Sequence, residues 1–241
     1  MPVFQLTDKL IFPSPELATE DGLLAVGGDL SRDRLLAAYR EGIFPWYSEG
    51  DPILWWSPEP RMVLFPNEFR PSRSLRRLGR SGRFDMRMDT AFDEVIVACA
   101  SVPRPGQDGT WITAAMERAY CDLHDAGYAH SVECWEGGRL VGGLYGVSLG
   151  RCFFGESMFS KVSNTSKLAS WALAAQLVRW NFSLIDCQIY TEHVAGLGAK
   201  SVHREEFQHL LHEGLQAETR RGRWQLETDI FDTKSNERPD T

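Results

Sequence analysis

One short segment, residues 184–190 (Leu-Ile-Asp-Cys-Gln-Ile-Tyr), combines aliphatic side chains with a single acid. We predict a β-strand here, and successive side chains of a strand point to opposite faces of the sheet. Asp186 and Gln188 therefore share one face, and Ile185 and Cys187 share the other. A carboxylate within such a strand is costly unless it is hydrogen-bonded or paired, so Asp186 is a candidate for function. The alternative is an edge strand on which Asp186 faces solvent.

A second acid lies in similar surroundings. In the segment 153–159 (Phe-Phe-Gly-Glu-Ser-Met-Phe), Glu156 alternates with Phe154 and Met158 along an otherwise apolar strand. If the two predicted strands belong to one sheet, Glu156 and Asp186 can line a common pocket that holds a cationic group such as a substrate ammonium. The sequence alone does not show that they meet.

One stretch of the chain is strongly basic. Residues 70–87 hold seven arginines and one acid, although the whole chain has a net charge of −7. Four of the arginines follow helical spacing after a potential N-cap at Ser72: Arg73, Arg76, Arg77 and Arg80. Like charges on one helix face repel each other, and a phosphate backbone would compensate them. An ordinary solvated surface, neutralised by nearby acidic loops, is the alternative.

Two motifs that would mark another chemistry are incomplete. Residues 193–201 contain glycines like a phosphate-binding loop, but the Walker spacing is absent because Ala199 precedes the lysine, so we predict a tight turn between a strand and a helix. His209, His212 and Glu213 do not match the spacing of zinc-dependent proteases, so we expect a solvated helix face and no metal site.

The amino-terminal sixty residues are predicted to form a compact module with one helix. Ser31 is its N-cap, and Gly42 follows its last turn, where a left-handed residue commonly ends a helix. The aromatic, proline-punctuated stretch at 42–58 is too broken for regular structure and too apolar for a linker. We therefore expect it to pack on the rest of the protein.

The second unit, from about residue 61, shows both strand and helix periodicity. Three strands are predicted to form an antiparallel meander, with a hairpin turn at Gly137-Gly138: 131–136, 139–147 and 151–158. Three helices are predicted: 113–126, 166–180 and 204–215. With the strand at 184–190, this order predicts an α+β domain with helices packed over a mostly antiparallel sheet. The polar residues 234–241 are expected to be a loose tail.

The composition limits the class of protein. The chain has 241 residues, of which 43% are hydrophobic and 24% charged, as is typical of a globular protein. We find no apolar run near the ~18 residues of a membrane span and no secretory signal, so we expect a cytoplasmic protein. The five cysteines are odd in number and form no Cys-x-x-Cys pair, which indicates reduced thiols.

Six motifs together resemble one enzyme family, the leucyl/phenylalanyl-tRNA–protein transferases. They are Gly27-Gly-Asp29, Gly42-Ile-Phe-Pro-Trp46, Leu54-Trp-Trp-Ser-Pro58, Gly109-Thr-Trp-Ile-Thr113, Gly155-Glu-Ser-Met-Phe-Ser160 and Ile185-Asp-Cys-Gln188. One of them alone is weak evidence, but six in the right order, over roughly residues 3–215, are a specific signal.

The resemblance implies a small amino-terminal domain at 1–62 and a GNAT-like acyltransferase domain at 63–241 that accepts aminoacyl-tRNA instead of acetyl-CoA. It implies transfer of leucine or phenylalanine, with methionine as a further candidate donor, to acceptor proteins that begin with arginine or lysine. This transfer marks the acceptor for degradation by the bacterial N-end rule pathway. No metal or other cofactor is implied, and we expect a monomer.

By the same resemblance, Asp186, Gln188 and Glu156 form the catalytic centre. Two roles for Asp186 stay open: a proton relay through Gln188 to the acceptor amine, or orientation of that amine while the tRNA ribose hydroxyl helps proton transfer. Glu156 would add negative charge near the amino end of the acceptor.

The resemblance also indicates where the donor binds. Eight residues are expected there: Tyr39, Trp46, Trp111, Leu144, Phe153, Met158, Ile185 and Cys187. The first three are expected near the terminal adenosine, because aromatic rings stack on bases. The chain has Leu144, Ser170 and Leu173 where the family pattern has methionine, leucine and phenylalanine, so its donor preference stays open. The tRNA acceptor arm is expected on five arginines: Arg73, Arg76, Arg77, Arg80 and Arg83.

Two other functions fit part of the pattern. An acetyl-CoA-dependent N-acetyltransferase of the same fold would need a pyrophosphate loop, and residues 193–198 have the glycines of that loop but not its first residue. A tRNA-binding protein without catalytic activity would need only the arginine face.

Overall fold

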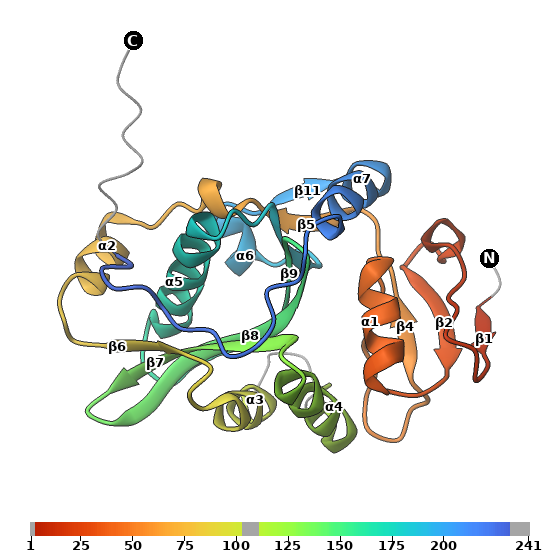
Figure 1. Ribbon diagram of the computed structural model, residues 1–241, viewed down its shortest axis with the longest axis horizontal. Coiled ribbons are helices and arrows are strands. Elements are labelled where there is room, and N and C mark those ends of the chain that lie inside the picture. Colours follow the sequence, from red (N-terminus) through yellow and green to blue (C-terminus); the bar gives the residue numbers. More distant parts are fainter. Residues whose placement is uncertain (1–2, 103–110, 232–241) are drawn as a thin grey trace, which may run out of the picture.

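The computed structural model describes residues 3–102 and 111–231 (Figure 1). The predicted tail at 234–241 and the first two residues of the motif at 109–113 lie outside the described residues. Within the described ranges the chain forms two sheets, and α-helices pack over the larger one, which confirms the predicted α+β class.

The smaller sheet is built by amino-terminal residues and has the strand order β1-β2-β4-β3. Its strands are β1 (Phe4–Leu6), β2 (Leu23–Gly27), β3 (Phe44–Pro45) and β4 (Leu54–Trp56). A 3-10 helix, η1 (Pro15–Leu17), precedes β2. Helix α1 (Arg32–Arg40) is the helix predicted after Ser31, and Gly42 beyond it has a left-handed φ of +69°.

The aromatic stretch at 42–58 differs from the prediction in one respect. It contains β3 and β4, although we expected no regular structure there. The two strands are too short to show an alternating pattern in the sequence, and their antiparallel pairing supplies the backbone hydrogen bonds. The predicted packing is confirmed, because Ile43, Phe44 and Trp55 are buried.

The larger sheet has seven strands among the described residues, in the order β11-β5-β10-β9-β8-β7-β6. They are β5 (Arg61–Leu64), β6 (Asp85–Met88), β7 (Ala129–Glu136), β8 (Arg139–Leu149), β9 (Cys152–Ser160), β10 (Leu184–Gln188) and β11 (Lys200–Val202). Within this sheet only the pair β9 and β10 is parallel, so the predicted meander and the mostly antiparallel sheet are confirmed. The short strands β5, β6 and β11 were not predicted.

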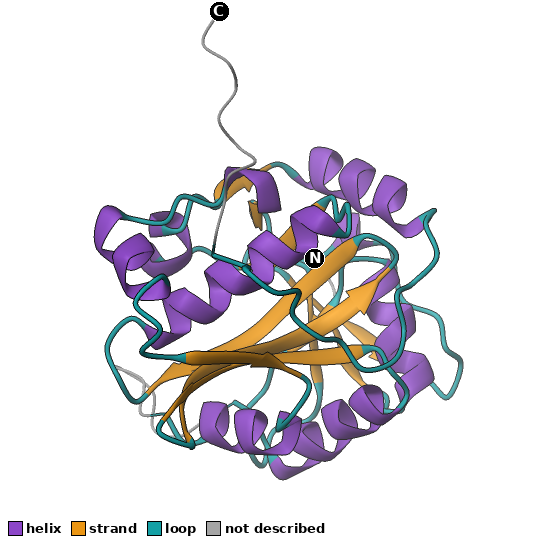
Figure 2. Ribbon diagram, turned by 60° about the vertical axis from the view of Figure 1, so that its left-hand side comes forward, coloured by secondary structure: helices purple, strands orange, loops and turns teal. Residues whose placement is uncertain are grey.

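Helices cover both faces of this sheet (Figure 2). The helices that follow β5 in the chain are η2 (Pro66–Glu68), α2 (Arg73–Gly79), α3 (Phe92–Ala100), α4 (Ala114–Asp125), α5 (Thr165–Arg179), α6 (Glu192–Gly196) and α7 (Arg204–Leu215). Helix α5 packs on one face of β7 and β8, and α3 and α4 pack on the other face (Figure 1). The segment at 193–201 forms most of α6, a turn and the start of β11.

Helix α5 is buried more completely than we predicted. From their helical spacing we predicted one apolar face, made of Leu168, Trp171, Ala172, Ala175 and Val178. Trp171 is buried, but Val178 is 39% exposed. Leu173 and Leu177, which lie outside the predicted face, are also buried. The chain beyond α7 packs against this helix, with the Phe231 ring 4.5 Å from that of Trp171, so α5 is covered on a second side. The sequence of α5 alone does not reveal that second cover.

Strands β9 and β10 separate part-way along their length. Their parallel pairing extends only from Leu184↔Cys152 to Asp186↔Phe154. Beyond this point β9 continues along β8 as far as Ser160, whereas β10 bends at Gln188, whose φ is +64°. The side chains that follow Phe154 on β9 and Asp186 on β10 therefore lie beside a break in the sheet.

Candidate active site

A cavity of about 710 Å³ lies where β9 and β10 separate. Seven of the eight residues that we expected at the donor site line it: Trp46, Trp111, Leu144, Phe153, Met158, Ile185 and Cys187. Ser170 and Leu173, two of the positions at which the chain departs from the family pattern, line it as well. The structure thus brings together residues from β8, β9, β10, α5 and the segment after β3.

Tyr39 is the expected donor-site residue that does not line the cavity. Its side chain is 1% exposed, and its hydroxyl lies 2.6 Å from that of Tyr120. The Tyr120 hydroxyl in turn donates to Oε2 of Glu156 over 2.8 Å. Tyr39 therefore lies behind the cavity wall and supports the residues that form it.

Glu156 lies in the cavity wall at a β-bulge. Tyr145 of β8 pairs with Ser157 and Gly146 pairs with Gly155, so Glu156 has no partner residue on β8. Bulges often redirect side chains beside active sites. The bulge also interrupts the predicted alternation of Phe154, Glu156 and Met158 along one strand face. As a result, Phe154 and Met158 pack in different clusters of the core.

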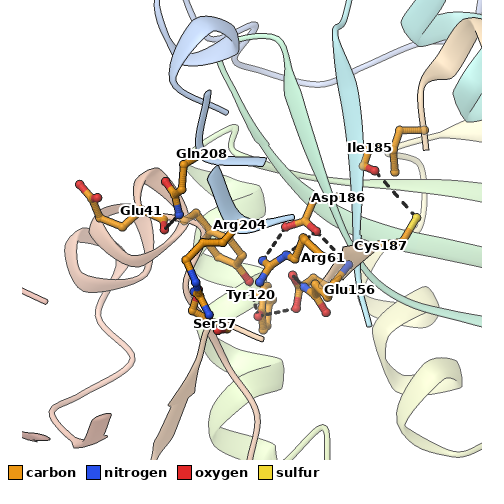
Figure 3. A network of polar contacts seen from close by, with 12 residues as sticks. Glu41, Ser57, Arg61, Tyr120, Glu156, Ile185, Asp186, Cys187, Arg204 and Gln208 are labelled. Atoms are coloured by element: carbon orange, nitrogen blue, oxygen red, sulfur yellow. Dashed lines mark hydrogen bonds and ion pairs between the residues drawn. The ribbon is translucent and has the colours of Figure 1, made fainter. Parts of the chain in front are cut away.

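The carboxyl group of Glu156 is buried and hydrogen-bonded on both oxygens. Tyr120 donates to Oε2, and Nε2 of Gln188 donates to Oε1 over 2.9 Å (Figure 3 shows the tyrosine contact). Burial, together with the charge of Asp186, raises the pKa of Glu156 from 4.5 to about 7, although these hydrogen bonds lower it. Glu156 can therefore change its protonation state near neutral pH.

Asp186 is fully buried and pairs with an arginine of the same chain. Arg61 of β5 donates from Nε to Oδ1 over 2.9 Å and from Nη2 to Oδ2 over 2.7 Å (Figure 3). Oδ1 also accepts the backbone N–H of Gln188 at 2.8 Å. Neither Asp186 nor Arg61 lines the cavity. The two acids therefore do not line a common pocket: Glu156 lines the cavity, and Asp186 pairs with Arg61.

Gln188 connects the two carboxylates. An aspartate side chain that accepts the N–H two residues further on closes a local turn, and this turn holds Gln188 in the left-handed region. The register between β10 and β5 shifts at the same place. The side-chain amide of Gln188 then reaches Glu156 across the break in the sheet. The strand at 184–190 thus ends at Gln188, and Tyr190 is 66% exposed.

The expected tRNA-binding arginines lie on and after α2. Oγ of Ser72 accepts the N–H of Leu75 and caps this helix as predicted. All five arginines, from Arg73 to Arg83, are exposed. Arg83 pairs with Glu136 over 2.7 Å, whereas none of the ion pairs found within 3–102 and 111–231 involves Arg73, Arg76 or Arg77. The part of this surface on α2 thus keeps its positive charge.

Two residues of the site were missed by sequence reasoning. Arg61 stands at the start of a short strand and carries no periodic signal, and its partner Asp186 is 125 positions away. The helical spacing of Met116, Ala119, Tyr120 and Leu123 predicts that Tyr120 lies on the apolar face of the helix at 113–126. It does lie there, but its hydroxyl faces Glu156. Aromatic periodicity locates a tyrosine on the correct face and says nothing about the partner of its hydroxyl.

Two further observations bear on cofactors and membranes. In the described part of the chain there is no group of three or more His, Cys, Asp or Glu side chains that could hold a metal ion. The helices formed by these residues are also too short or too polar to span a bilayer.

This chain matches one protein family in two segments. The model described as "Leucyl/phenylalanyl-tRNA protein transferase" matches residues 63–212, and the model of the N-terminal domain of that family matches residues 28–59.

Two curated proteins, each called "Leucyl/phenylalanyl-tRNA--protein transferase", are similar over nearly their full lengths. The protein from Syntrophus aciditrophicus (strain SB) is 56% identical and covers 96% of this chain and 97% of its own length. The protein from Desulfatibacillum aliphaticivorans is 56% identical and covers 95% and 98%. A solved structure, of a functionally unknown conserved protein from Staphylococcus epidermidis ATCC 12228, is 9% identical with a TM-score of 0.41, and it covers 75% of this chain and 68% of its own. That distant likeness assigns no fold family.

Proposed function

The chain belongs to the leucyl/phenylalanyl-tRNA–protein transferase family, and we propose that the cavity between β9 and β10 is where this enzyme joins its two substrates. The enzyme transfers leucine or phenylalanine from aminoacyl-tRNA to the amino terminus of acceptor proteins that begin with arginine or lysine. The transfer marks the acceptor for degradation by the N-end rule pathway. Family membership replaces the two other functions considered above, an acetyl-CoA-dependent acetyltransferase and a tRNA-binding protein without catalytic activity.

The donor aminoacyl side chain occupies the apolar part of the cavity. Phe153, Met158 and Ile185 supply much of its wall, and an apolar side chain gains free energy by leaving water there. Ser170 donates its hydroxyl hydrogen to the carbonyl of Ser166 within α5, so it offers the donor a small side chain without a free hydrogen-bond donor. We expect this position to set how large a donor side chain the cavity accepts, including methionine.

The terminal adenosine stacks on Trp46 and Trp111, which line the same cavity. Tyr39 does not take part in this stacking. Its burial and its contact with Tyr120 support a structural role behind Glu156.

Glu156 accepts a proton from the attacking amine. In the reaction the acceptor nitrogen forms a bond to the ester carbonyl carbon, the bond from that carbon to the ribose oxygen breaks, and the proton lost by nitrogen is returned to the ribose oxygen. A group with a pKa of about 7, held in the cavity wall, suits this transfer at neutral pH. Because Gln188 donates to Glu156 through Nε2, its Oε1 is left to accept an N–H of the amine.

Asp186 orients this centre and does not relay a proton. Of the two roles left open by the sequence, orientation is supported by the engagement of its carboxylate with Arg61 and with the N–H of Gln188. Its separation from the cavity supports the same role.

The exposed arginines of α2 and the loop after it bind phosphates of the tRNA acceptor arm. Arg73, Arg76 and Arg77 carry most of this binding, since Arg83 already pairs with Glu136. Figure 1 shows α2 at the end of the molecule opposite to α1, so the tRNA contact extends well beyond the cavity.

The domain at 63–241 is a GNAT-like acyltransferase domain, and the small domain is 1–62. Support comes from the parallel pair β9/β10 that separates within a mostly antiparallel sheet, and from the change of sheet between β4 and β5. We include a cytoplasmic monomer in the proposal; the cytoplasm is where aminoacyl-tRNA is made.

The observation that carries this proposal is the hydrogen-bonded pair of Glu156 and Gln188 in the wall of an otherwise apolar cavity. The test is incubation of the protein with radiolabelled Leu-, Phe- or Met-tRNA and a peptide that begins with arginine. We expect label on the peptide amino terminus, and little transfer by Glu156→Gln. Transfer by a Glu156→Gln variant at the wild-type rate would remove the catalytic assignment.

A further inference from the structure

Arg61 lies outside the cavity but contacts Asp186, the residue that accepts the backbone N–H of Gln188. It is 1% exposed, and Nε and Nη2 of its guanidinium bind both oxygens of Asp186. We propose that Arg61 is a positioning residue for aminoacyl transfer: through Asp186 it holds the turn at Gln188, and its charge balances that of Asp186 beside Glu156. This inference rests on the roles proposed above for Gln188 and Glu156.

The positioning follows a continuous series of contacts. Arg61 fixes the plane of the Asp186 carboxylate, because a bidentate guanidinium pair permits one arrangement of the two groups. Oδ1 of this fixed carboxylate accepts the N–H of Gln188, and Nε2 of Gln188 reaches Oε1 of Glu156. A rotation of Asp186 would release the left-handed backbone at Gln188, which is unfavourable for a residue other than glycine unless its surroundings hold it.

The position of Arg61 is itself set by three separate elements. The side chain extends from β5 and its guanidinium lies between two aromatic rings, at 4.9 Å from the ring centre of Phe44 on β3 and 4.7 Å from that of Phe207 on α7. Nη1 has no hydrogen-bond partner in the described part of the chain. A buried ion pair with an unpaired nitrogen adds little stability compared with apolar packing, which favours a positioning role over a purely structural one.

Several ionisable groups of the described residues surround Glu156. These are Tyr39 from α1, Tyr120 from α4, Tyr145 from β8, and the pair Arg61–Asp186 from β5 and β10. Burial raises the pKa of Tyr39 and Tyr120 well above 10, so both stay neutral near pH 7. Burial is the largest cause of the raised pKa of Glu156, and the charge of Asp186 adds to it; Arg61, paired with Asp186, is the positive charge that opposes this contribution.

Removal of the Arg61 charge and removal of the Asp186 charge should shift the pKa of Glu156 in opposite directions. Without the Arg61 charge, the negative charge of Asp186 is no longer balanced, and Glu156 becomes harder to ionise beside it. Without the Asp186 charge, the remaining guanidinium favours ionised Glu156. A residue that only stabilised the fold would produce no such opposite shifts.

The test uses single-turnover transfer from Phe-tRNA to a saturating arginine-initiated peptide, measured from pH 5.5 to 9. In Arg61→Met the acid limb of the rate profile should move up by about one pH unit, and in Asp186→Asn it should move down by a similar amount. Arg61→Lys keeps the charge but not the two-point contact, so its acid limb should stay near that of the wild type while its maximal rate falls ~100-fold. The Kd for Phe-tRNA should change less than about twofold in all three, because none of these residues lines the cavity.

Arg34 provides a matched control. It is also a fully buried arginine with an aspartate partner, Asp29 at 3.1 Å, but it lies in the amino-terminal module and holds the carbonyls of Thr7 and Lys9. Arg34→Lys should lower the melting temperature without moving the acid limb.

The outcomes separate this inference from the proposed function. The role of Arg61 would be overturned if Arg61→Lys kept more than half of the wild-type rate. It would also be overturned if the acid limb of Arg61→Met matched that of the Arg34→Lys control. If Glu156→Gln is fully active while Arg61→Lys is slow, the positioning role stands and the proton-accepting role of Glu156 fails. If Arg61→Met does not fold, the other two variants still test the role of Arg61. Arg61→Lys should be slower than the wild type with an unchanged acid limb, and Asp186→Asn should have an acid limb at lower pH.

Discussion

Replacement of Glu156 by glutamine is the most direct perturbation of the site. The substitution keeps the shape of the side chain and lets it bond to Tyr120 and Gln188, but it removes the group that accepts a proton. General acid–base catalysis commonly contributes ~10²–10⁴-fold, so we expect the transfer rate of Glu156→Gln to fall by that factor, or about 3–5 kcal/mol in activation free energy.

The pH dependence gives this prediction a second measurable quantity. Glu156 must be ionised to accept a proton, so the wild-type rate should rise with pH through about 7, the pKa to which burial raises this group. The α-amine of the acceptor also titrates, near ~7.7–8.0, but it does so equally in both proteins when one peptide is used. The ratio of wild-type to variant rates therefore isolates Glu156, and it should increase between pH 6 and 8.

The stability of the protein should change in the opposite sense. The pKa of Glu156 is higher in the folded protein than in the unfolded chain, so between pH 4.5 and about 7 the folded state binds more protons. Stability is then lost as pH rises through this window, and above it the buried carboxylate destabilises the wild type by up to about 3 kcal/mol. Glu156→Gln should therefore melt at a higher temperature than the wild type at pH 8, and the difference should shrink at pH 5.

The assay combines single-turnover transfer from labelled Phe-tRNA with thermal unfolding of the same protein preparations. A flat rate ratio between pH 6 and 8 would refute the reasoning about the proton acceptor. A variant that is slow but less stable at pH 8 would show instead that Glu156 is an ordinary structural residue, ionised and favourably paired in the fold.

Three further predictions concern the remaining parts of the site. Arg76→Ala with Arg77→Ala should weaken binding of charged tRNA and lower the slope of log Kd against log salt by about 2, whereas an unchanged slope would move this surface out of the tRNA contact. Ser170→Leu should narrow the cavity and reduce transfer from Phe-tRNA more than from Leu-tRNA, which competition between the two donors will measure; equal losses would place the donor side chain elsewhere. Tyr120→Phe removes a hydrogen bond that lowers the pKa of Glu156, so the acid limb of the rate profile should move to higher pH, and an unmoved limb would contradict the contact.

The sequence was sufficient for features that depend on local pattern. Helices α1, α4 and α7 and the meander β7-β8-β9 have strong periodicity and clear end signals, such as Gly42 and Gly137-Gly138, and they form where predicted. The short strands β5, β6 and β11 lack such a pattern, because three or four residues are too few to show alternation.

The sequence also identified the residues of the site by type. A carboxylate within an apolar strand carries a desolvation cost in any fold, and both acids that meet this description, Glu156 and Asp186, are buried. Six motifs in order identified the family, which the matches at 28–59 and 63–212 confirm.

Only the tertiary structure decided how these two acids differ. Bulges at Glu156 and before Gln188 end the alternation from which we assigned the strand faces, and a bulge is a response to neighbouring strands that the strand's own sequence does not encode. The partner of Asp186 is Arg61, 125 residues away, and only the pairing of β5 with β10 brings it there. Sequence fixes which groups carry charge, but ionisation depends on solvent access and on distances between charges, which exist only once the chain has folded.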